Sequence, residues 1–592
     1  MKKWTELDEQ NKKSLKVLMI LTILLGVSLT ALFIQRTNAY VRVERITVQS
    51  AGANIDANLL YPTRLPVNQT KHPLVVYLHG IGQQRDFDLR IPIEFAKRGF
   101  YVAALDYQGQ GTSAGTIANL DPNPPAPLPS TTLPATAVDS TYLLNKLETM
   151  DFWSDVNESW IGIIGHSLGG MVMYQSQALD PRYTCAVGWA PAFNMSFIGP
   201  YPVPQELIDF SPANLLNESN SENLLIIASD KDEILPYESQ FLAAQNATGC
   251  DLITITDQLL LGNHQLYDYR VYNWTFAWFE SHWFGSTELN GPVEISFWNN
   301  YILLFINIGL IIALIVYFTI HAARFFKLRD YKEIDKEETS DLKTNKQKTI
   351  KVLTNVVLPI AIFLIVYEIF ESLYSVWSLF FSSIILLGGY AIYRIVLYFI
   401  KKDRKKFNFK EMLRYQFTWR PLLYAITCGL LFLGVWMLFT WVYPFMWVIP
   451  SRVGYFFIGV IVAFPFYLTL EILFRRLVFP ALVFTKYRTI IVLVLQLIAL
   501  ISIMQLTNWI AWVPNVIFAY LMLLVTLFLN TFIYRATRRF SNVMIVGFIT
   551  VTIFVGAAIG TMFGIGIALR FMVGYYVDWN NIFLAAINWL WW

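Results

Sequence analysis

The stretch IGIIGHSLGGMVM, from Ile161 to Met173, lies in the first third of a chain of 592 residues. Apolar residues lead into the motif GHSLG at residues 165–169, and a helix-forming run follows it. Small residues two before and two after a serine let a strand and a helix approach closely, so that the turn lifts the hydroxyl above the sheet. The stretch therefore predicts a nucleophile elbow with Ser167 as the nucleophile, flanked by Gly165, His166, Leu168 and Gly169.

Similar apolar runs on both sides of this stretch alternate with helical patterns. Continuous apolar runs are typical of parallel strands that are covered on both faces, and alternation of strand and helix predicts a doubly wound, mostly parallel α/β sheet. Ligands in such sheets bind at the carboxyl ends of the strands. Strands are expected at 42–60 (a pair), 73–80, 100–107, 160–167, 184–191, 223–230 and 250–257, and helices at 90–98, 136–150, 169–179 and 237–247.

The sequence HGIG, from His79 to Gly82, follows one of these strands directly. An oxyanion hole needs two backbone N–H groups aimed at the developing charge, and glycines let the backbone turn towards it. We expect one N–H from Ile81 and the other from Leu168, the residue after the nucleophile. His79 itself is expected to brace the loop.

A serine hydroxyl becomes a nucleophile when a histidine takes its proton and a carboxylate orients that histidine. His264, in LLLGNHQLYDY after the last strand, fits the chain order of serine, acid and histidine. For the acid, IIASDKDEILP offers Asp230 and Asp232; Asp232 is favoured because it lies farther beyond the strand, and Asp230 stays open as the alternative. Asp106 is expected to brace the loop after its own strand.

These motifs resemble the α/β-hydrolase fold superfamily over roughly residues 42–285, and most closely its dienelactone-hydrolase, serine-aminopeptidase and monoacylglycerol-lipase-like groups. The resemblance implies that Ser167, Asp232 and His264 form the triad and that the strands follow the order 1-2-4-3-5-6-7-8. Cys185 and Cys250 would then begin the sixth and eighth strands. Two strand spacings are about 9.5 Å, beyond the reach of a disulfide, so free thiols are expected.

The composition indicates a membrane protein, because 55% of the residues are hydrophobic and only 15% are charged. Near the N-terminus, VLMILTILLGVSLTALFI follows several lysines. Its eighteen residues would span about 27 Å as a helix, close to a hydrocarbon core. A retained anchor is favoured over a cleaved signal peptide, and both place the following domain outside the cytoplasm.

The second half of the chain is a series of apolar runs whose connections alternate in charge. Basic connections at 321–351, 401–420, 475–488 and 535–539 follow the positive-inside pattern and place the N-terminus in the cytoplasm. Because they adjoin spans, they indicate anchoring at the cytoplasmic surface and not nucleic-acid binding. Eight further spans are expected at about 297–320, 352–370, 373–400, 421–443, 453–474, 489–507, 512–534 and 542–569, with 571–592 either interfacial or a tenth span.

The expected organisation is a cytoplasmic N-terminus and anchor (1–39), an extracytoplasmic α/β-hydrolase domain (40–290) and an all-α, polytopic membrane domain (291–592). Six Asn-X-Ser/Thr sequons all fall in the middle segment, which fits an exported domain that is open to glycosylation. They are Asn68, Asn157, Asn194, Asn217, Asn246 and Asn273.

The sequence predicts a membrane-anchored serine hydrolase that cleaves an ester, thioester or amide through an acyl-enzyme. A small molecule, a lipid or a peptide could carry the acyl group. This chemistry requires no metal or cofactor, so neither is expected. Two alternatives stay open: transfer of the acyl group to another acceptor, or a transporter or receptor with an inactive hydrolase-like ectodomain, since one anchor would suffice for an enzyme. Within the spans, Glu471 and Arg475 are spaced for a helical ion pair.

Overall fold

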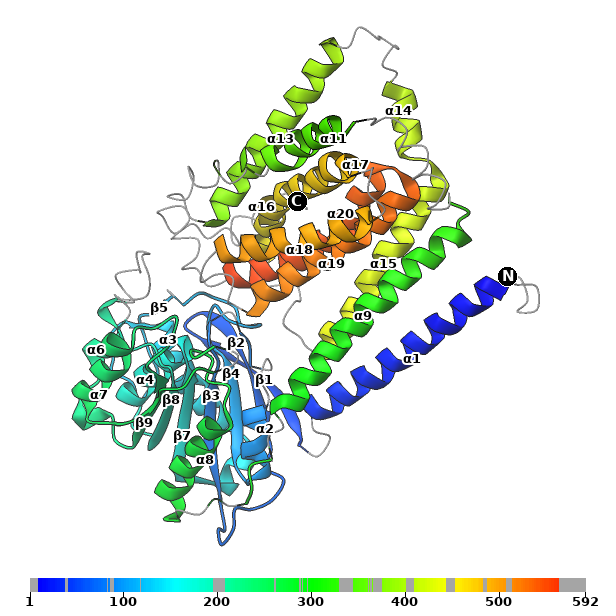
Figure 1. Cartoon of the computed structure of the whole chain (residues 1–592). Helices are drawn as coiled ribbons and strands as arrows, with labels where there is room; N and C mark the ends of the chain where they lie inside the picture. The colour runs from blue at the N-terminus through cyan, green and yellow to red at the C-terminus, as the bar shows by residue number, and fades with distance from the viewer. Residues whose placement is uncertain are drawn as a thin grey trace, which may run out of the picture.

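The computed structural model divides into an α/β domain and a helical half, with the α/β domain at one end of the molecule (Figure 1). The anchor expected at 1–39 corresponds to one long helix, α1 (Glu9–Thr37), and the α/β domain follows it. The structure describes residues 9–37, 41–81, 83–85, 90–117, 119–194, 208–259, 262–286, 289, 291–294, 297–328, 344–359, 361–362, 365, 375–400, 409–442, 453–482, 487–506 and 514–563.

An eight-stranded sheet forms the centre of the α/β domain, in the order β1-β2-β4-β3-β7-β8-β9-β10. Counted along the chain, this is the order 1-2-4-3-5-6-7-8 that the resemblance implies. β2 pairs antiparallel with β1 and with β4, and all other neighbours are parallel. The strands are β1 (Val43–Ser50), β2 (Ala53–Leu60), β3 (His72–Leu78), β4 (Tyr101–Asp106), β7 (Val156–His166), β8 (Cys185–Trp189), β9 (Leu224–Ser229) and β10 (Asp251–Ile255).

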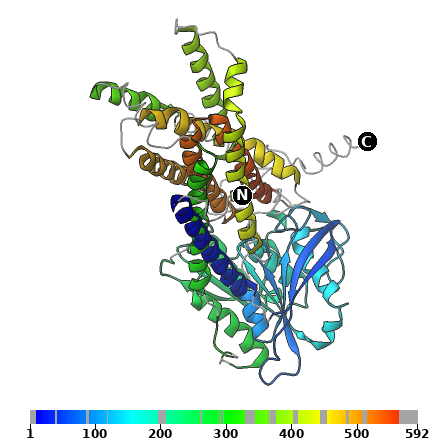
Figure 2. The ribbon, with the colours of Figure 1, turned by 90° about the vertical axis from the view of Figure 1, so that its right-hand side faces the viewer.

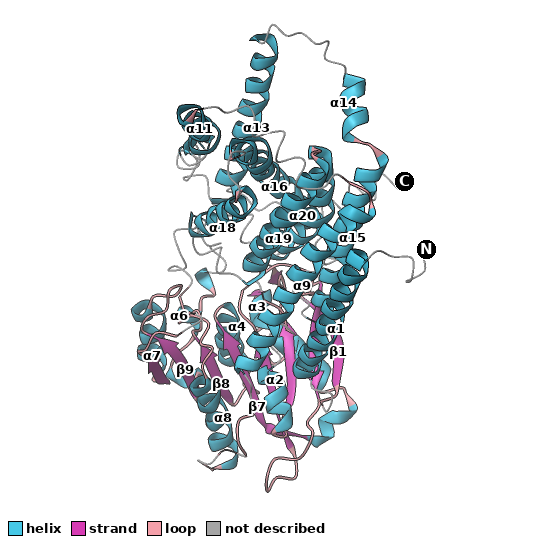
Figure 3. Cartoon of the chain, turned by 45° about the vertical axis from the view of Figure 1, so that its right-hand side comes forward, coloured by secondary structure: helices cyan, strands magenta, loops and turns pink. Residues whose placement is uncertain are grey.

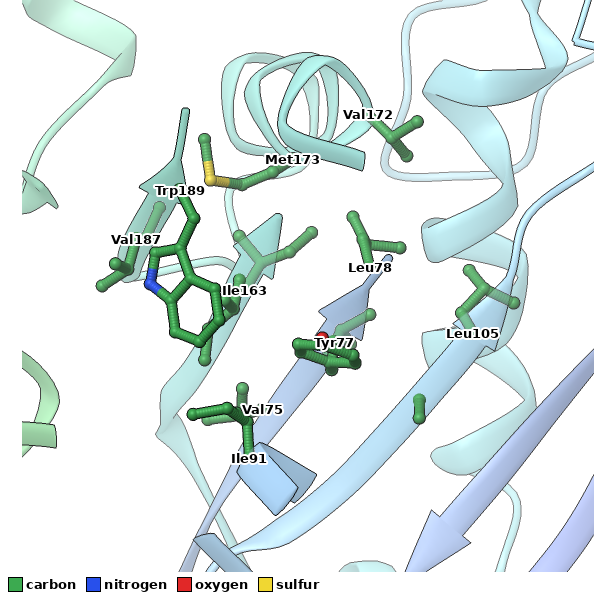
Figure 4. Close-up of a cluster of buried hydrophobic side chains, with 14 of the residues drawn as sticks. Val75, Tyr77, Leu78, Ile91, Leu105, Ile163, Val172, Met173, Val187 and Trp189 are labelled. Carbon is green, nitrogen blue, oxygen red and sulfur yellow. The ribbon is translucent and has the colours of Figure 1, made fainter. Parts of the chain in front are cut away.

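The central strands are buried on both faces, which explains their continuous apolar runs. Every residue of β4, β8 and β9 is buried. Figure 4 shows Leu78 of β3 on the side of the sheet that carries Val172 and Met173 of the helix after β7, whereas Trp189 of β8 points to the opposite side, with Tyr77 and Ile91. This continuous core holds the carboxyl ends of the strands in fixed positions, and those ends carry the site.

Helices cover the two faces of the sheet in pairs. On one face, α2 (Arg90–Lys97) packs against α8 (Tyr269–Phe284) through Phe95 and Phe276, whose ring centroids lie 4.6 Å apart. On the other face, α3 (Ala135–Leu147) packs against α4 (Leu168–Leu179), and the hydroxyls of Ser140 and Ser176 are hydrogen-bonded at 2.7 Å. Short helices α6 (Pro212–Leu215) and α7 (Ala243–Thr248) lie at the edges.

Two segments show features that the sequence analysis did not predict. The proline-rich stretch at 121–134 is closed at its ends by a two-stranded ladder, β5 (Leu120–Asp121) with β6 (Leu133–Pro134). The helix expected at 237–247 begins with a wide π-turn over Glu238–Leu242 before α7. The ladder depends on the pairing of Leu120 with Pro134 and of Asp121 with Leu133, which local composition does not report.

The cysteines agree with the expectation of free thiols. Cys185 and Cys250, together with Cys428 in the helical half, are all unpaired and buried. Burial raises the pKa of Cys250 to about 11, so its thiol stays protonated at neutral pH. These side chains therefore serve as small apolar core residues.

Four helical segments of the described residues are long and apolar enough to cross a membrane: Asn11–Ile34, Ile302–Phe325, Trp419–Leu438 and Tyr520–Thr537. Shorter apolar helices lie at Phe380–Ile392, Arg488–Ser502 and Phe540–Val551. The remaining expected spans stay predictions; most of 358–370 and all of 571–592 lie outside the described residues. Helices of this half are α9 (Phe297–Phe325), α11 (Asn345–Val352), α13 (Ser375–Ile400), α14 (Phe409–Gln416), α15 (Trp419–Val442), α16 (Val453–Ile472), α17 (Phe479–Ala481), α18 (Arg488–Leu506), α19 (Pro514–Thr537) and α20 (Phe540–Phe563).

The helix before the α/β domain and the one after it lie side by side. α1 and α9 run together in two views (Figure 1 and Figure 2), and the amide of Asn307 donates to the carbonyl of Ser28 at 3.3 Å. The segment that leads into α9 is tied to the α/β domain by buried Arg98, which donates to the carbonyl of Gly291 at 2.7 Å and pairs with Glu280 at 2.9 Å. The α/β domain is therefore held against the start of α9.

Candidate active site

Ser167 lies between the end of β7 and the start of α4, as the nucleophile-elbow motif predicts. Its backbone has φ +52° and ψ −116°, a conformation that a residue with a side chain rarely adopts. The amide of Ser167 donates to the carbonyl of Trp189 on the neighbouring strand at 2.9 Å, which helps to hold the turn. This strained, well-held backbone aims the hydroxyl outwards from the sheet.

The flanking glycines are required by close contacts between backbone atoms. A Cβ on Gly165 would lie 2.2 Å from the carbonyl oxygen of Gly169, and a Cβ on Gly169 would lie 2.4 Å from that of His79. Both distances are far below van der Waals contact. The two glycines therefore let α4 pack directly on the ends of β7 and β3.

Replacing Gly169 by alanine tests this packing. The added methyl meets backbone that cannot rotate away, so we expect a loss of about 3 kcal/mol of stability and a fall in Tm of roughly 6–12 °C. Thermal melting of the purified full chain measures the change. Gly434→Ala is the control, since a Cβ there would meet no atom of another described segment within 4 Å. Equal melting of the two variants would contradict the prediction.

The structure brings His264 and Asp232 to Ser167. Nε2 of His264 lies 2.9 Å from the hydroxyl oxygen of Ser167, and Nδ1 lies 2.8 and 3.0 Å from the two carboxylate oxygens of Asp232. Because a carboxylate only accepts hydrogen bonds, Nδ1 carries the proton and Nε2 is left as the acceptor that faces the serine. All three side chains are almost completely buried.

The loop after β9 explains why Asp232 and not Asp230 faces the histidine. One carboxylate oxygen of Asp232 also accepts the amides of Ile234 and Leu235, each at 2.8 Å, so the side chain is folded into its own turn. Asp230 is exposed, and its amide extends the pairing with β10 by donating to the carbonyl of Ile255.

Two residues that sequence reasoning missed hold the histidine loop. A carboxylate oxygen of Glu233 accepts the amides of Asn263 and His264, at 3.0 and 3.1 Å. The Asn263 side chain donates to the hydroxyl of Ser229 at 2.6 Å and to the carbonyl of Asp257 at 2.9 Å. Their adjacency to Asp232 and His264 is the only sequence signal that could have identified them.

His166, expected only as a member of the motif, also contacts the histidine loop. Its Nε2 donates to the carbonyl of His264 at 3.0 Å. Burial, aided by the neighbouring His264 ring, lowers the pKa of His166 to about 4, so the side chain is neutral at neutral pH. A neutral His166 adds no charge beside the catalytic histidine candidate.

The expected oxyanion donors lie beside Ser167. Leu168 is the first residue of α4, and a helix leaves its first amides without an intrahelical acceptor. Ile81 lies in the turn after β3, next to Gly80, where a Cβ would be 3.5 Å from that of Ser167. The amide of Gly80 is already occupied by the side chain of Gln83 at 3.1 Å. This pattern is compatible with the Ile81 and Leu168 amides as the two donors.

A buried charged network braces this turn, as expected for His79 and Asp106. Nε2 of His79 lies 3.0 Å from the carboxylate of Asp106, which also accepts the amide of Thr112 at 2.8 Å and the guanidinium of Arg85. Burial alone would raise the pKa of Asp106, but Arg85 and the hydrogen bonds outweigh it and hold that pKa well below its usual range. Sequence reasoning missed Arg85, whose partner is 21 residues away.

A second buried carboxylate, Asp139 of α3, supports the loop after β4. It accepts the amide of Gln108 and the hydroxyl of Ser50, both at 2.6 Å. Burial, only partly offset by these hydrogen bonds, raises the pKa of Asp139 to about 6. In the folded chain this carboxyl therefore holds its proton at a higher pH than it does in the unfolded chain.

That difference predicts a pH-dependent contribution to stability. The pKa of this carboxyl is about 4 in the unfolded chain. Between about pH 4 and pH 6 the folded chain therefore binds more protons at Asp139 than the unfolded chain does, so the contribution of Asp139 to the free energy of unfolding falls as the pH rises through this window. The Tm of Asp139→Asn relative to the parent chain should therefore rise from pH 4 to pH 7, by the equivalent of about 2–3 kcal/mol. Thermal melting of both chains across this range measures it, and a constant difference in Tm would refute the prediction.

The sequon asparagines differ in exposure. Asn68, Asn217 and Asn246 are exposed, whereas Asn157, Asn194 and Asn273 are partly buried. Thr275, the hydroxyl residue of the last sequon, is fully buried and accepts the indole N–H of Trp189 at 2.9 Å. The first three sites are therefore the accessible ones.

No protein-family model matches the chain. An uncharacterized 31.7 kDa protein in the traX-finO intergenic region of Escherichia coli is 27% identical over 125 residues, or 21% of this chain. The chain spans only 39% of that relative's length.

Solved structures similar to parts of the chain include the following three, each with a low TM-score and low sequence identity. The 2,6-dihydroxy-pseudo-oxynicotine hydrolase has a TM-score of 0.32 and 17% identity, covering 42% of this chain and 70% of its own. Est1E from Butyrivibrio proteoclasticus, bound to ferulic acid, has a TM-score of 0.29 and 17% identity; the match covers 39% of this chain and 97% of Est1E. Dipeptidyl peptidase 4 of Porphyromonas gingivalis has a TM-score of 0.31 and 18% identity; the match covers 40% of this chain and 35% of the peptidase.

Proposed function

We propose that this chain is a membrane-anchored serine hydrolase that cleaves an ester, thioester or amide on the extracytoplasmic face. The observation that carries the proposal is the hydrogen-bonded series from Ser167 through His264 to Asp232, with Ser167 in a strained turn at the carboxyl edge of the sheet. A buried serine, histidine and carboxylate in this relation form the arrangement that activates a serine for acyl transfer.

In the first step, Oγ of Ser167 attacks the carbonyl carbon of the substrate while Nε2 of His264 takes the hydroxyl proton. Asp232, which accepts the proton on Nδ1, stabilises the imidazolium that forms. The negative charge on the carbonyl oxygen is met by the amides of Ile81 and Leu168. When the bond to the leaving group breaks, His264 returns its proton to that group, and the acyl chain stays on Ser167.

In the second step, water takes the place of the leaving group. His264 accepts a proton from the water, whose oxygen attacks the acyl-enzyme, and then returns that proton to Oγ of Ser167. The products are a carboxylic acid and the free enzyme. If another alcohol or amine takes the place of water, the same residues transfer the acyl group instead.

The arrangement of the two halves favours a lipid or another membrane-associated amphiphile as the acyl donor. β5 and α6 follow the carboxyl ends of β4 and β8, and both lie on the side of the α/β domain that faces the helical half (Figure 1). Figure 3 shows the same placement for α6. The site at this edge is therefore directed towards the apolar helices. A donor that partitions into the bilayer would approach from that side.

Labelling with a fluorophosphonate that cannot cross a membrane tests both the nucleophile and its side. Intact cells expressing the full chain should be labelled, Ser167→Ala should abolish labelling, and Ser154→Ala, at an exposed serine of the same domain, should retain it. Absence of labelling in a folded parent chain would overturn the serine mechanism. Labelling only after lysis would overturn the extracytoplasmic placement.

A further inference from the structure

His79, the first residue after β3, has an oxygen atom within hydrogen-bond distance of each of its two ring nitrogens. Nε2 lies 3.0 Å from a carboxylate oxygen of Asp106, and Nδ1 lies 2.8 Å from the carbonyl oxygen of Gly80. The side chain is buried, with only 1% of its surface exposed. Both contacts are therefore made out of reach of solvent, and the proton count of the ring has to satisfy them.

Neither of these two oxygens can donate a hydrogen bond. A backbone carbonyl only accepts. Burial opposes the ionisation of Asp106, but Arg85 and hydrogen bonds outweigh it and hold the pKa of that carboxyl well below its usual range, so it is a carboxylate that only accepts. A neutral imidazole carries one proton and would turn a lone pair towards one of the two oxygens. Both contacts are satisfied together only when each nitrogen of His79 carries a proton, which makes the ring a cation.

The surroundings of His79 suit a cation. The ring of Tyr107 stacks on the imidazole with centroids 5.1 Å apart and an angle of 23° between the planes, and a cation is attracted to the face of an aromatic ring. Two carboxylates offset the charges of His79 and Arg85. Asp106 contacts both cations, and the charge of Arg85 helps to lower the pKa of Asp56 against the effect of burial. The buried imidazolium is therefore paired, as a buried charge has to be.

The carbonyl that His79 contacts belongs to the same peptide group as the amide of Ile81. This peptide bond is trans, so the Gly80 carbonyl and the Ile81 N–H point in opposite directions. The carbonyl also accepts the amide of Gln83 at 3.2 Å. A hydrogen bond from a charged donor is roughly twice as strong as a neutral one, and hydrogen bonds in series polarise one another. The contact with His79 therefore fixes the direction of the Ile81 N–H and makes it a stronger donor.

This peptide group lies close to the nucleophile. A Cβ on Gly80 would be 3.5 Å from the Cβ of Ser167 and 2.7 Å from Nδ1 of His166. His166 is neutral at neutral pH, because burial lowers its pKa to about 4, so it does not oppose a cation nearby. Fixed dipoles and charges are most effective in catalysis where negative charge develops, which here is the carbonyl oxygen of the substrate beside Ser167.

We propose that His79 is a buried imidazolium that orients and polarises the Gly80–Ile81 peptide, so that the Ile81 N–H stabilises the oxyanion more strongly. The proposal rests on the proposed function and makes His79 a positioning residue, because it acts through the peptide group and does not touch the substrate. It goes beyond bracing of the loop, for which the contact with Asp106 would suffice. Because the oxyanion is fully charged only in the transition state, the effect is on kcat and not on KM.

Two substitutions of His79 separate its two contacts. The amide nitrogen of a glutamine can take the place of Nε2 and keep the contact with Asp106, whereas that of an asparagine can take the place of Nδ1 and keep a neutral donor to the Gly80 carbonyl. With a short-chain p-nitrophenyl ester and the purified full chain, His79→Gln should lower kcat by about 10–100-fold with KM within about twofold, less than the loss of a whole oxyanion donor. The loss in His79→Asn should be at least about threefold smaller.

His72→Gln is the matched control, since the same substitution is made at the other end of β3. Nδ1 of His72 also lies 2.7 Å from a backbone carbonyl, that of Gly99, but about 20 Å from the site. This variant should hydrolyse the ester at the parental rate. Parental kcat in a folded His79→Gln chain would overturn the proposal, and so would a loss in His79→Asn as large as that in His79→Gln. An inactive parent chain would instead remove the proposed function, and the proposal with it.

Solid-state NMR of the full chain in lipid tests the charge on His79 even if its variants do not fold. The chain carries ¹⁵N-labelled histidine and glycine labelled with ¹³C at the carbonyl, and spectra are recorded at about pH 8, where an ordinary histidine is neutral. We expect one imidazolium, protonated on both nitrogens, with Nδ1 close to a labelled glycine carbonyl, as the contact with Gly80 requires. Neutral imidazoles alone would overturn the proposal, whatever the kinetic results.

Discussion

Replacing Ser167 by alanine will abolish hydrolysis of a soluble probe ester by the full chain, with kcat lowered by about 10⁵–10⁶-fold. The reason is that acylation needs an oxygen at the position 2.9 Å from Nε2 of His264, and no other hydroxyl is hydrogen-bonded to that nitrogen in the described structure. Release of p-nitrophenolate from a short-chain ester measures the loss. The fold should be unaffected, because the Ser167 hydroxyl bonds only to His264 among the described residues.

The control for this variant is Ser154→Ala, at an exposed position remote from the elbow, which should hydrolyse the ester at the parental rate. Thermal melting should give the same Tm for all three chains. Substantial residual hydrolysis in a folded Ser167→Ala chain would exclude Ser167 as the nucleophile and favour the reading of the α/β domain as an inactive ectodomain.

The second large effect is expected at the carboxylate. Asp232→Asn should lower kcat by about 10⁴-fold with little change in KM. An amide at this position can donate to Nδ1 of His264, which would move the imidazole proton to Nε2 and leave no acceptor for the Ser167 proton. Steady-state hydrolysis of the same ester by the purified chain measures this effect.

Asp230→Asn is the matched control, since it makes the same chemical change two residues earlier in the same loop. Asp230 is exposed, so the change should alter kcat by less than about twofold. If the two variants exchanged their effects, the alternative that the sequence left open would be correct. If both variants changed kcat only slightly and to the same extent, neither carboxylate would have a role in the mechanism.

Much of the α/β domain follows from local pattern. Parallel strands covered on both faces need continuous apolar runs, so the runs at 73–80, 100–107 and 223–230 identify β3, β4 and β9. The β5–β6 ladder could not be predicted from local pattern, because each of its strands has two residues and its register depends on a partner across the proline-rich loop. The irregular pairing between β3 and β7 near His72 could not be predicted either, because it also depends on the partner strand.

The candidate site divides in a similar way. The elbow is visible in sequence because its steric requirements fall on residues 165 and 169, both within two positions of Ser167. Arg85 and Glu233 give no comparable signal, since polar residues in loops are common and only their partners reveal a role. The contacts of Arg85 with Asp106, and of Glu233 with the His264 loop, join segments that lie far apart along the chain.

The sequence by itself determined the strand order through resemblance, the serine turn through its glycines, and the division into an α/β half and an apolar half through composition. Those features depend on spacing within a few residues or on averages over many. Only the tertiary structure decided which acid faces His264, because Asp232 and His264 are 32 residues apart and the turn at Ile234 and Leu235 aims the carboxylate. It also brought Arg488 and Arg538, from separate helix ends, to the ring of Phe479, since such contacts depend on how the helices pack.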